Sequence, residues 1–170
     1  DYTSGRLKML ALPETKRPRF AVYNEMAARG YREVVSYAFV DEQWEQDFAA
    51  NTHPIRLQNP LAAQYAVMRS TLIGGLVEVL QNNLNRKQNR VRVLEIARVF
   101  SKESADQVVQ NERIGGLWYG SVQPEQWGEK TRNVDFYDMK ADVESLLKNK
   151  EVSFVKTEHP ALHPGRAANI

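Results

Sequence analysis

The chain has 170 residues, 42% of them hydrophobic, with 23 basic and 21 acidic side chains and a formal net charge of +2. This length fits one domain with a real core, and the near balance of charge argues against a dedicated nucleic-acid binder, which usually shows a clustered basic excess. Because cysteine is absent, disulfides and cysteine-bound metals are excluded, and with no membrane-length apolar run or secretory signal pattern we expect a cytoplasmic protein.

Residues 1–18 lack hydrophobic periodicity and are predicted to be a connector to the domain that follows. A helix is predicted next, because Phe20, Tyr23 and Ala27 recur at helical spacing. Gly30 then stands where a left-handed residue would end that helix.

The segment 31–40 is predicted to be a strand, because it alternates and is rich in aromatic and β-branched residues. One side of that strand would carry Tyr31, Glu33, Val35, Tyr37 and Phe39. A short helix capped by Asp41 is predicted after it. Residues 53–62 are expected to be extended, because two of them precede proline.

A second long helix is predicted over 71–84, where four leucines repeat every fourth residue. Gly74 and Gly75 disfavour its first turn by about 1 kcal/mol each, which indicates a close backbone approach there or a later start. A strand over 90–100 is predicted to follow.

A polar turn over 101–112 and a buried strand over 113–122 are predicted next. Asp135 is expected to cap a third helix, whose buried face would comprise Phe136, Met139, Val143, Leu146 and Leu147. Asp138 and Asp142 are placed on its solvated face. A last strand is predicted over 151–156. Because this order of helices and strands lacks regular βαβ alternation, the prediction is an α+β domain with a mostly antiparallel sheet.

Glu95 is the only charge on one face of the strand 90–100, where Val91, Val93, Ala97 and Val99 are its neighbours. A carboxylate on such a face must be paired, hydrogen-bonded or protonated. The structural interpretation is a buried charge bonded to a nearby loop or arginine. The functional alternative is a carboxylate that faces a cleft.

The remaining polar residues form no catalytic set. The 3 histidines all precede proline, which makes the helical spacing of His159 and His163 an improbable metal site. No phosphate-binding loop and no nucleophile elbow are present. The residues alone therefore indicate an α+β domain and do not assign a reaction.

Three segments, 59–100, 134–147 and 159–170, carry a family resemblance in their order along the chain. The most specific residues of the first segment are Asn59, Pro60, Met68, Arg69, Ser70, Leu72, Asn83, Asn85, Arg86, Glu95, Ile96, Arg98, Val99 and Phe100. Those of the second are Asp135, Phe136, Tyr137, Asp138 and Lys140. On this pattern the chain, from about Phe20 to Ile170, resembles the synthetase-like core module of the bacterial phenylalanyl-tRNA synthetase beta subunit family.

The resemblance implies a class II aminoacyl-tRNA synthetase-like fold, an antiparallel sheet flanked by helices, in a domain over 19–170. The domain is expected to be incomplete at its C-terminal end, as a piece of a longer chain, because the glycine-rich motif 3 is not in this sequence. The helix 19–29 and the strand 31–39 would be the counterpart of motif 1, which builds the dimer interface in such enzymes. The candidate subunit-interface residues are therefore Phe20, Tyr23, Ala27 and Tyr31.

The strand 90–100 would correspond to the first strand of motif 2, which in a working site leads to an arginine that binds ATP. Ser101 is expected at that position, and Lys102 cannot give the planar two-pronged contact of a guanidinium. The resemblance thus implies a catalytically silent core with no catalytic, cofactor-binding or metal residues. The parent complex would still be an ATP-dependent and magnesium-dependent ligase.

Beta subunits of this family pair with a catalytic alpha subunit in a heterotetramer of two alpha and two beta subunits. The resemblance therefore implies the alpha subunit as partner and tRNA(Phe) as a ligand of the complex. Two alternatives stay open: a stand-alone tRNA- or RNA-binding module without catalysis, and an active adenylating enzyme.

Overall fold

The computed structural model describes residues 17–102, 107–148 and 150–170. The elements run in the order α1 (Arg19–Ala28), β1 (Arg32–Glu33), β2 (Phe39–Val40), α2 (Glu42–Ala49), η1 (Ala63–Tyr65), β3 (Val67–Met68), α3 (Ile73–Asn85), β4 (Val91–Lys102), β5 (Val108–Tyr119), α4 (Phe136–Leu146), β6 (Val155–Lys156) and β7 (Ala168–Asn169). The fold is α+β, as predicted. Nearly all of the predicted connector 1–18 lies outside the described residues.

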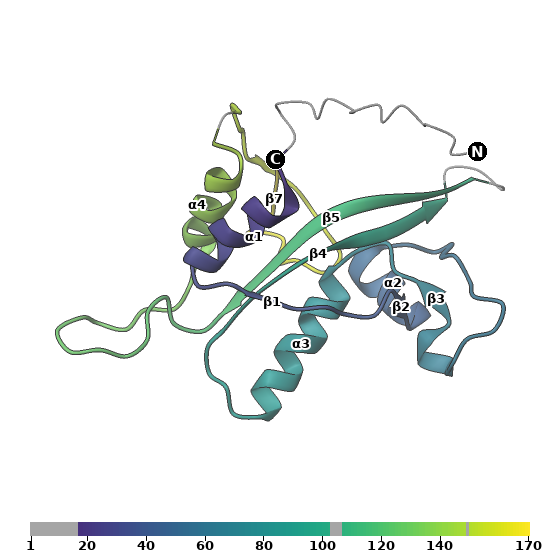
Figure 1. Cartoon of the computed structure of the whole chain (residues 1–170), viewed down its shortest axis with the longest axis horizontal. Helices are drawn as coiled ribbons and strands as arrows, with labels where there is room; N and C mark the ends of the chain where they lie inside the picture. Colours follow the sequence, from purple (N-terminus) through teal and green to yellow (C-terminus); the bar gives the residue numbers. More distant parts are fainter. Residues whose placement is uncertain (1–16, 103–106, 149) are drawn as a thin grey trace, which may run out of the picture.

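A long hairpin of β4 and β5 forms the centre of the molecule (Figure 1). The two strands pair antiparallel from Val91 opposite Tyr119 to Lys102 opposite Val108. β1 joins the other edge of β4 in parallel, which gives the sheet order β1-β4-β5. The predicted antiparallel sheet is therefore correct for the hairpin and wrong for β1, because α2 and α3 between β1 and β4 let the chain return in the same direction.

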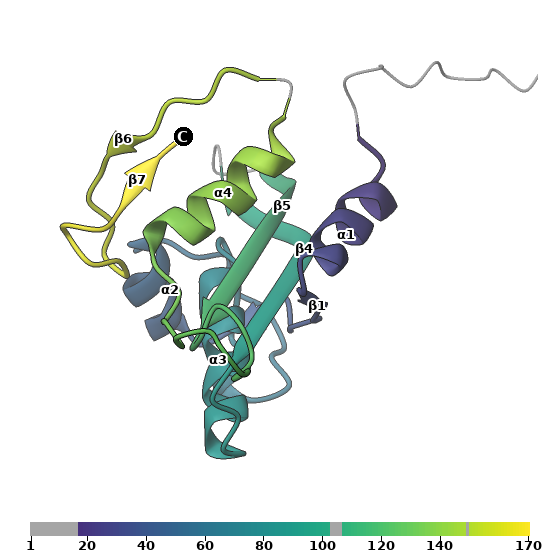
Figure 2. The same ribbon diagram turned by 90° about the vertical axis from the view of Figure 1, so that its left-hand side faces the viewer.

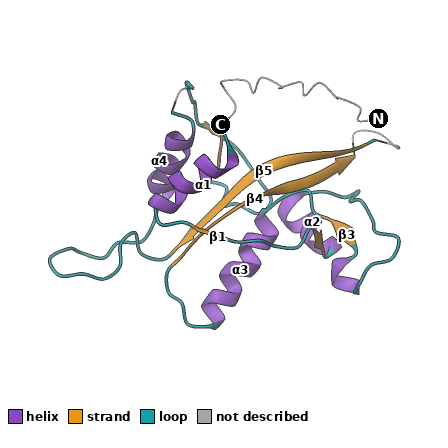
Figure 3. Ribbon diagram, in the orientation of Figure 1, coloured by secondary structure: helices purple, strands orange, loops and turns teal. Residues whose placement is uncertain are grey.

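Helices cover both faces of this hairpin (Figures 1 and 2). On one face, Leu72 and Leu76 pack against the β4 side chains Val91, Val93 and Val99. On the opposite face, α1 and α4 lie over β4, where the buried cluster comprises Met26, Tyr31 and Leu94, with Leu146 beside it. The two small sheets, β2-β3 (Figure 3) and β6-β7 (Figure 2), lie outside this three-layer centre.

The predicted strand 31–40 is wrong in its middle. Its ends form β1 and β2, which belong to different sheets. The chain bends between them because the Ser36 backbone N–H donates to the Glu95 side chain, 3.2 Å away, instead of to a neighbouring strand. The expected common face is lost, since Tyr31 is 5% exposed and Tyr37 is 68% exposed.

The predicted turn 101–112 is too long, and the predicted buried strand 113–122 contains no fully buried residue. β4 continues to Lys102 and β5 already begins at Val108. Ile114, in the middle of β5, is 45% exposed because β5 is the edge strand of the sheet and is only partly covered. Helical termini agree better with the sequence: Asp41 caps α2, Asp135 caps α4 in a reciprocal capping box, and Gly30 has a φ of +86°.

The predicted close approach at the start of α3 is confirmed. Gly74 and Gly75 are both buried within the first turn of the helix. A Cβ on Gly75 would lie 2.4 Å from the Ser36 hydroxyl, and one on Gly74 would lie 2.8 Å from the Trp44 ring. Both glycines therefore let α3 pack directly on the segments before it. None of the described helices is long and apolar enough to span a membrane.

Replacement of Gly75 by alanine tests this packing. In a solvent-exposed helix, alanine would gain about 1 kcal/mol over glycine. In Gly75→Ala we expect the opposite, a loss of about 1–3 kcal/mol in the free energy of unfolding, because the methyl group overlaps Ser36. Urea denaturation measures the change. The control is Asn82→Ala on the exposed side of the same helix, and a Gly75→Ala chain as stable as this control would contradict the packing argument.

Candidate functional site

The strand that resembles motif 2 is β4, and its outer end is solvent-exposed. Ser101 and Lys102 are still part of β4, paired with Val109 and Val108, so they do not lie in a loop beyond the strand. Both are exposed. Arg98 lies on the strand, where its guanidinium donates to the Gln110 side chain at 3.3 Å. Glu103 lies outside the described residues.

Glu95 lies in the interior of β4 and is 2% exposed. Its Oε1 accepts from the Arg69 guanidinium at 3.0 Å, and its Oε2 accepts from the Ser36 hydroxyl at 2.7 Å. Arg69 is itself 5% exposed and also donates to the carbonyl oxygens of Tyr37 and Arg98. Glu95 is therefore a paired structural charge, which fixes the bend after β1 to β3 and β4.

A second buried carboxylate binds the residue that follows Arg69. Glu45, on α2, is 1% exposed. It accepts from the Ser70 backbone N–H at 2.8 Å and from the Ser70 hydroxyl at 2.5 Å. Asn51 donates to the same carboxylate at 2.7 Å. The Arg69–Ser70 pair is thus held from two sides by two carboxylates, which gives this part of the family motif a structural role.

A third cluster joins α4 to α1 and β4. Asp142 is 3% exposed and accepts from Arg29 at 2.7 Å, from Arg92 at 2.8 Å and from the Tyr31 hydroxyl at 2.7 Å. The Arg92 guanidinium carbon also lies 3.4 Å from the centre of the Trp118 ring. The prediction that Asp142 lies on a solvated face is wrong, because three donors on other elements compensate its burial.

The same contacts set the protonation of this cluster. Burial by itself would raise the pKa of Asp142, but the hydrogen bonds from Tyr31, Arg92 and Arg29 outweigh it and hold that pKa below its ordinary value. Burial and the adjacent Asp142 carboxylate raise the pKa of the Tyr31 phenol. At neutral pH the cluster therefore holds an ionised carboxylate, two guanidinium groups and a neutral phenol.

The candidate interface residues fall into two groups. Phe20 is 74% exposed on α1, and Ala27 is exposed while Tyr23 is partly exposed on the same helix. Tyr31 is already covered within this chain, between Asp142 and Arg92. A partner could therefore reach the first three residues, and for them the interface stays a prediction.

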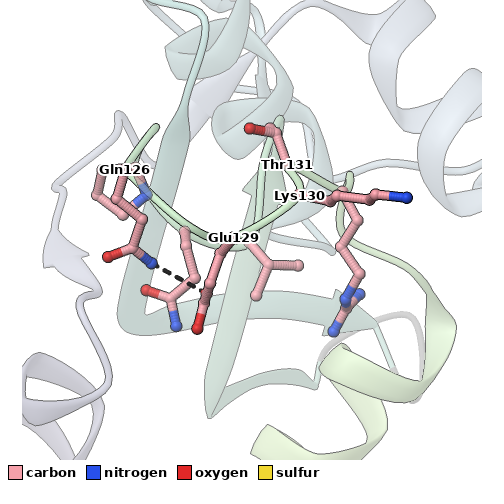
Figure 4. A pocket seen from close by; sticks show the side chains of 8 residues that line it. Gln126, Glu129, Lys130 and Thr131 are labelled. Carbon is pink, nitrogen blue, oxygen red and sulfur yellow. Dashed lines mark hydrogen bonds between the residues drawn. The ribbon is translucent and has the colours of Figure 1, made fainter.

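The loop between β5 and α4 encloses a small polar hollow of about 220 Å³ (Figure 4). The Gln126 amide donates to Glu129 at 3.0 Å across it, and Lys130 points away from this bond. Arg132 is held by Asp138 in a two-pronged ion pair at 2.6 Å. All residues that line the hollow except Val122 are exposed, so it opens to solvent.

The histidines are engaged in local turns. The Nδ1 atoms of His159 and His163 accept from backbone N–H groups two residues later, at 3.2 and 3.1 Å. His53 lies beside the Thr52 hydroxyl at 2.8 Å. Among the described residues, no three histidine or carboxylate side chains are grouped as a metal site would require.

Sequence reasoning missed the roles of Arg69, Glu45 and Asp142. Asp142 lies three residues after Met139 and four before Leu146, so its place within the apolar stripe of the helix was a readable signal. Glu45 similarly lies three residues before Phe48. Arg69 appeared only as part of a motif, and nothing in the sequence specified its partner.

A family model described as the phenylalanyl tRNA synthetase beta chain CLM domain matches residues 2–170. Among curated proteins, phenylalanine–tRNA ligase beta subunits of Neisseria meningitidis serogroup B, Neisseria gonorrhoeae and Chromobacterium violaceum are 88%, 85% and 56% identical over 170 residues. Each match covers 100% of this chain and 22% of the relative, so the chain spans less than a quarter of those proteins.

A solved structure shows the fold alone. It is that of a pyrrolysyl tRNA synthetase from Desulfitobacterium hafniense, with a TM-score of 0.52 and 13% sequence identity. The match covers 80% of this chain and 47% of that chain.

Removal of the Arg69 charge tests the buried pair. In Arg69→Met we expect a loss of about 3–5 kcal/mol in the free energy of unfolding, because Glu95 would stay buried without its counter-ion. The control is Arg56→Met, which breaks the exposed pair with Glu42 and should cost less than about 1 kcal/mol. Urea denaturation measures both variants. Equal losses in the free energy of unfolding would show that the buried pair contributes no more to stability than the exposed pair.

The Asp142 cluster predicts a dependence of stability on pH. A carboxyl group whose pKa is lowered by folding stabilises the folded state fully above its unfolded pKa of about 3.9, and this contribution is lost as the pH falls through the folded value. We expect the free energy of unfolding to fall from about pH 5 to pH 3, and Asp142→Asn to fall less steeply. Urea denaturation at each pH measures the slopes. The exposed Asp47→Asn is the control and should keep the original slope.

Proposed function

This chain belongs to the phenylalanyl-tRNA synthetase beta chain family, as its CLM domain, and from that premise we propose that it is a structural and interaction module without a catalytic site of its own. It would pair with the catalytic alpha subunit and so support the aminoacylation of tRNA(Phe) in protein synthesis. The observation that carries the proposal is the use of the arginines around the synthetase-like strand β4, which bind this chain's own groups.

Each of these arginines has an internal contact. Arg69 pairs with Glu95, and Arg92 pairs with Asp142. Arg90 donates to the carbonyl oxygens of Ser121 and Val122 at 3.0 Å. In phosphoryl and acyl transfer, such guanidinium groups would have to face developing negative charge. Arginines that fasten the sheet to its own loops and helices support a scaffold.

The end of β4 supports the same proposal. Ser101 stands where the resemblance would place the ATP-binding arginine of an active enzyme, and its side chain offers one hydroxyl group. A hydroxyl provides neither positive charge nor a planar pair of donors. ATP and magnesium would therefore be used by the alpha subunit within a complex of two alpha and two beta subunits in the cytoplasm.

A substitution on α1 tests the pairing. Phe20 is 74% exposed, so Phe20→Asp should leave the fold intact. If α1 forms the subunit interface, burial of this carboxylate against a partner should weaken the association of the full-length beta subunit with the alpha subunit by about tenfold or more. Size-exclusion chromatography and dissociation on dilution measure the effect.

The matched control is Leu61→Asp, which changes a residue that is 90% exposed and far along the chain from α1. It should leave the association unchanged. Calorimetric titration of the beta subunit with magnesium-ATP tests the other half of the proposal. Binding of ATP on β4 would contradict a silent core, and binding of tRNA by the beta subunit without the alpha subunit would favour the RNA-binding alternative.

A further inference from the structure

A pocket of about 280 Å³ lies beside α2. The helix α2 lies on the side of the sheet opposite α1 and α4 (Figure 1). We propose that this pocket receives an arginine side chain of the alpha subunit. The inference rests on the proposed function, because it assumes that the chain acts as an interaction module, and it specifies the chemistry of a second contact. The pocket is lined by aromatic rings and by two carboxylates, a combination that binds organic cations.

Aromatic side chains form its walls. Tyr37 and Tyr65 have ring centres 5.4 Å apart and planes tilted by 52°, and Phe39 and Trp44 also line the pocket. Tyr37 is 68% exposed, so much of its ring remains accessible to a ligand. An aromatic face that remains accessible attracts a cation placed over it.

Two carboxylates give the pocket its negative charge. Glu78, on α3, and Asp41, at the start of α2, both line it. Asp41 uses one oxygen to cap α2, where it accepts from the Gln43 N–H at 2.8 Å. Within the described ranges, neither carboxylate lies in an ion pair with a basic side chain. Glu78 is therefore the principal charge available to a ligand.

The buried pair beneath the pocket adds no opposing charge. Ser36 lines the pocket and also contacts both Arg69 and Glu95. Since the Arg69 guanidinium is neutralised by Glu95 at 3.0 Å, the floor carries no net positive charge. The same contacts hold the wall in place, because Arg69 donates to the Tyr37 carbonyl oxygen. The site is thus preorganised, which lowers the entropy lost on binding.

The size and chemistry of the pocket select arginine. Its volume lies just below the range of about 300–1,000 Å³ that drug-sized ligands occupy, so it would hold one side chain. A guanidinium group is planar, stacks on aromatic faces and donates to carboxylates in pairs. The Gln64 side chain at the rim offers a further oxygen acceptor. Arginine, tyrosine and tryptophan also tend to meet one another at the centres of protein interfaces.

The test uses the full-length beta subunit with 3-fluorotyrosine in place of Tyr37, which gives one ¹⁹F NMR signal at the pocket. N-acetyl-arginine-N-methylamide is the probe, and the citrulline analogue is its uncharged isostere. We expect the arginine probe to shift the signal saturably and the citrulline probe to bind at least about threefold more weakly. Glu78→Gln should weaken arginine binding by a similar factor. Asp47→Asn, an exposed acidic residue of α2 outside the pocket, should leave it unchanged.

A second measurement tests whether the alpha subunit supplies the arginine that occupies the pocket. In the complex with the alpha subunit, the signal should already be shifted and should no longer respond to the arginine probe. A signal that matches the free subunit, or equal responses to arginine and citrulline, would overturn the proposal. Tetramethylammonium binding more tightly than arginine would also overturn it in favour of a small organic cation. Failure of the two subunits to associate would instead contradict the proposed function, and this is read independently by chromatography.

Discussion

The Arg69 guanidinium and the Glu95 carboxylate meet at 3.0 Å in a region from which water is almost excluded. Neither charge would be tolerated there alone, because an unpaired buried ion costs several kcal/mol. The pair therefore forces three segments to meet: the bend at Ser36, the end of β3 and the middle of β4. The close packing of α3 depends on this arrangement, since Gly75 lies directly against the Ser36 hydroxyl.

On both faces of the hairpin, buried carboxylates hold separate segments of the chain together. On the α3 face, Glu95 and Glu45 hold the consecutive residues Arg69 and Ser70. On the other face, Asp142 collects donors from the end of α1, from the residue before β1 and from β4. Apolar contacts supply most of the driving force for such a fold, whereas these directional bonds determine which segments lie beside each other. These bonds hold the segments of the sheet in one arrangement.

The sequence predicted local features well and long-range partners poorly. The caps at Asp41 and Asp135 depend on residues within one turn, and both were correct. The need for a partner at Glu95 followed from the alternation of β4, but the identity of Arg69 did not, because a loop 26 residues away supplies it. The donors to Asp142 and the exposure of β5 were missed for the same reason. Each depends on what tertiary packing places against a face, which periodicity alone does not specify.

The Asp142 cluster also has a consequence for synthesis on the ribosome. Arg29, at the end of α1, precedes Asp142 by 113 residues. Nearly the whole domain is therefore synthesised before the Asp142 carboxylate is present to pair with Arg29. At roughly 5–20 residues per second, that interval lasts about 6–23 seconds. During this time Arg29 has no carboxylate partner and α1 has no α4 beside it. The contact between α1 and α4 therefore closes only when most of this domain has been synthesised.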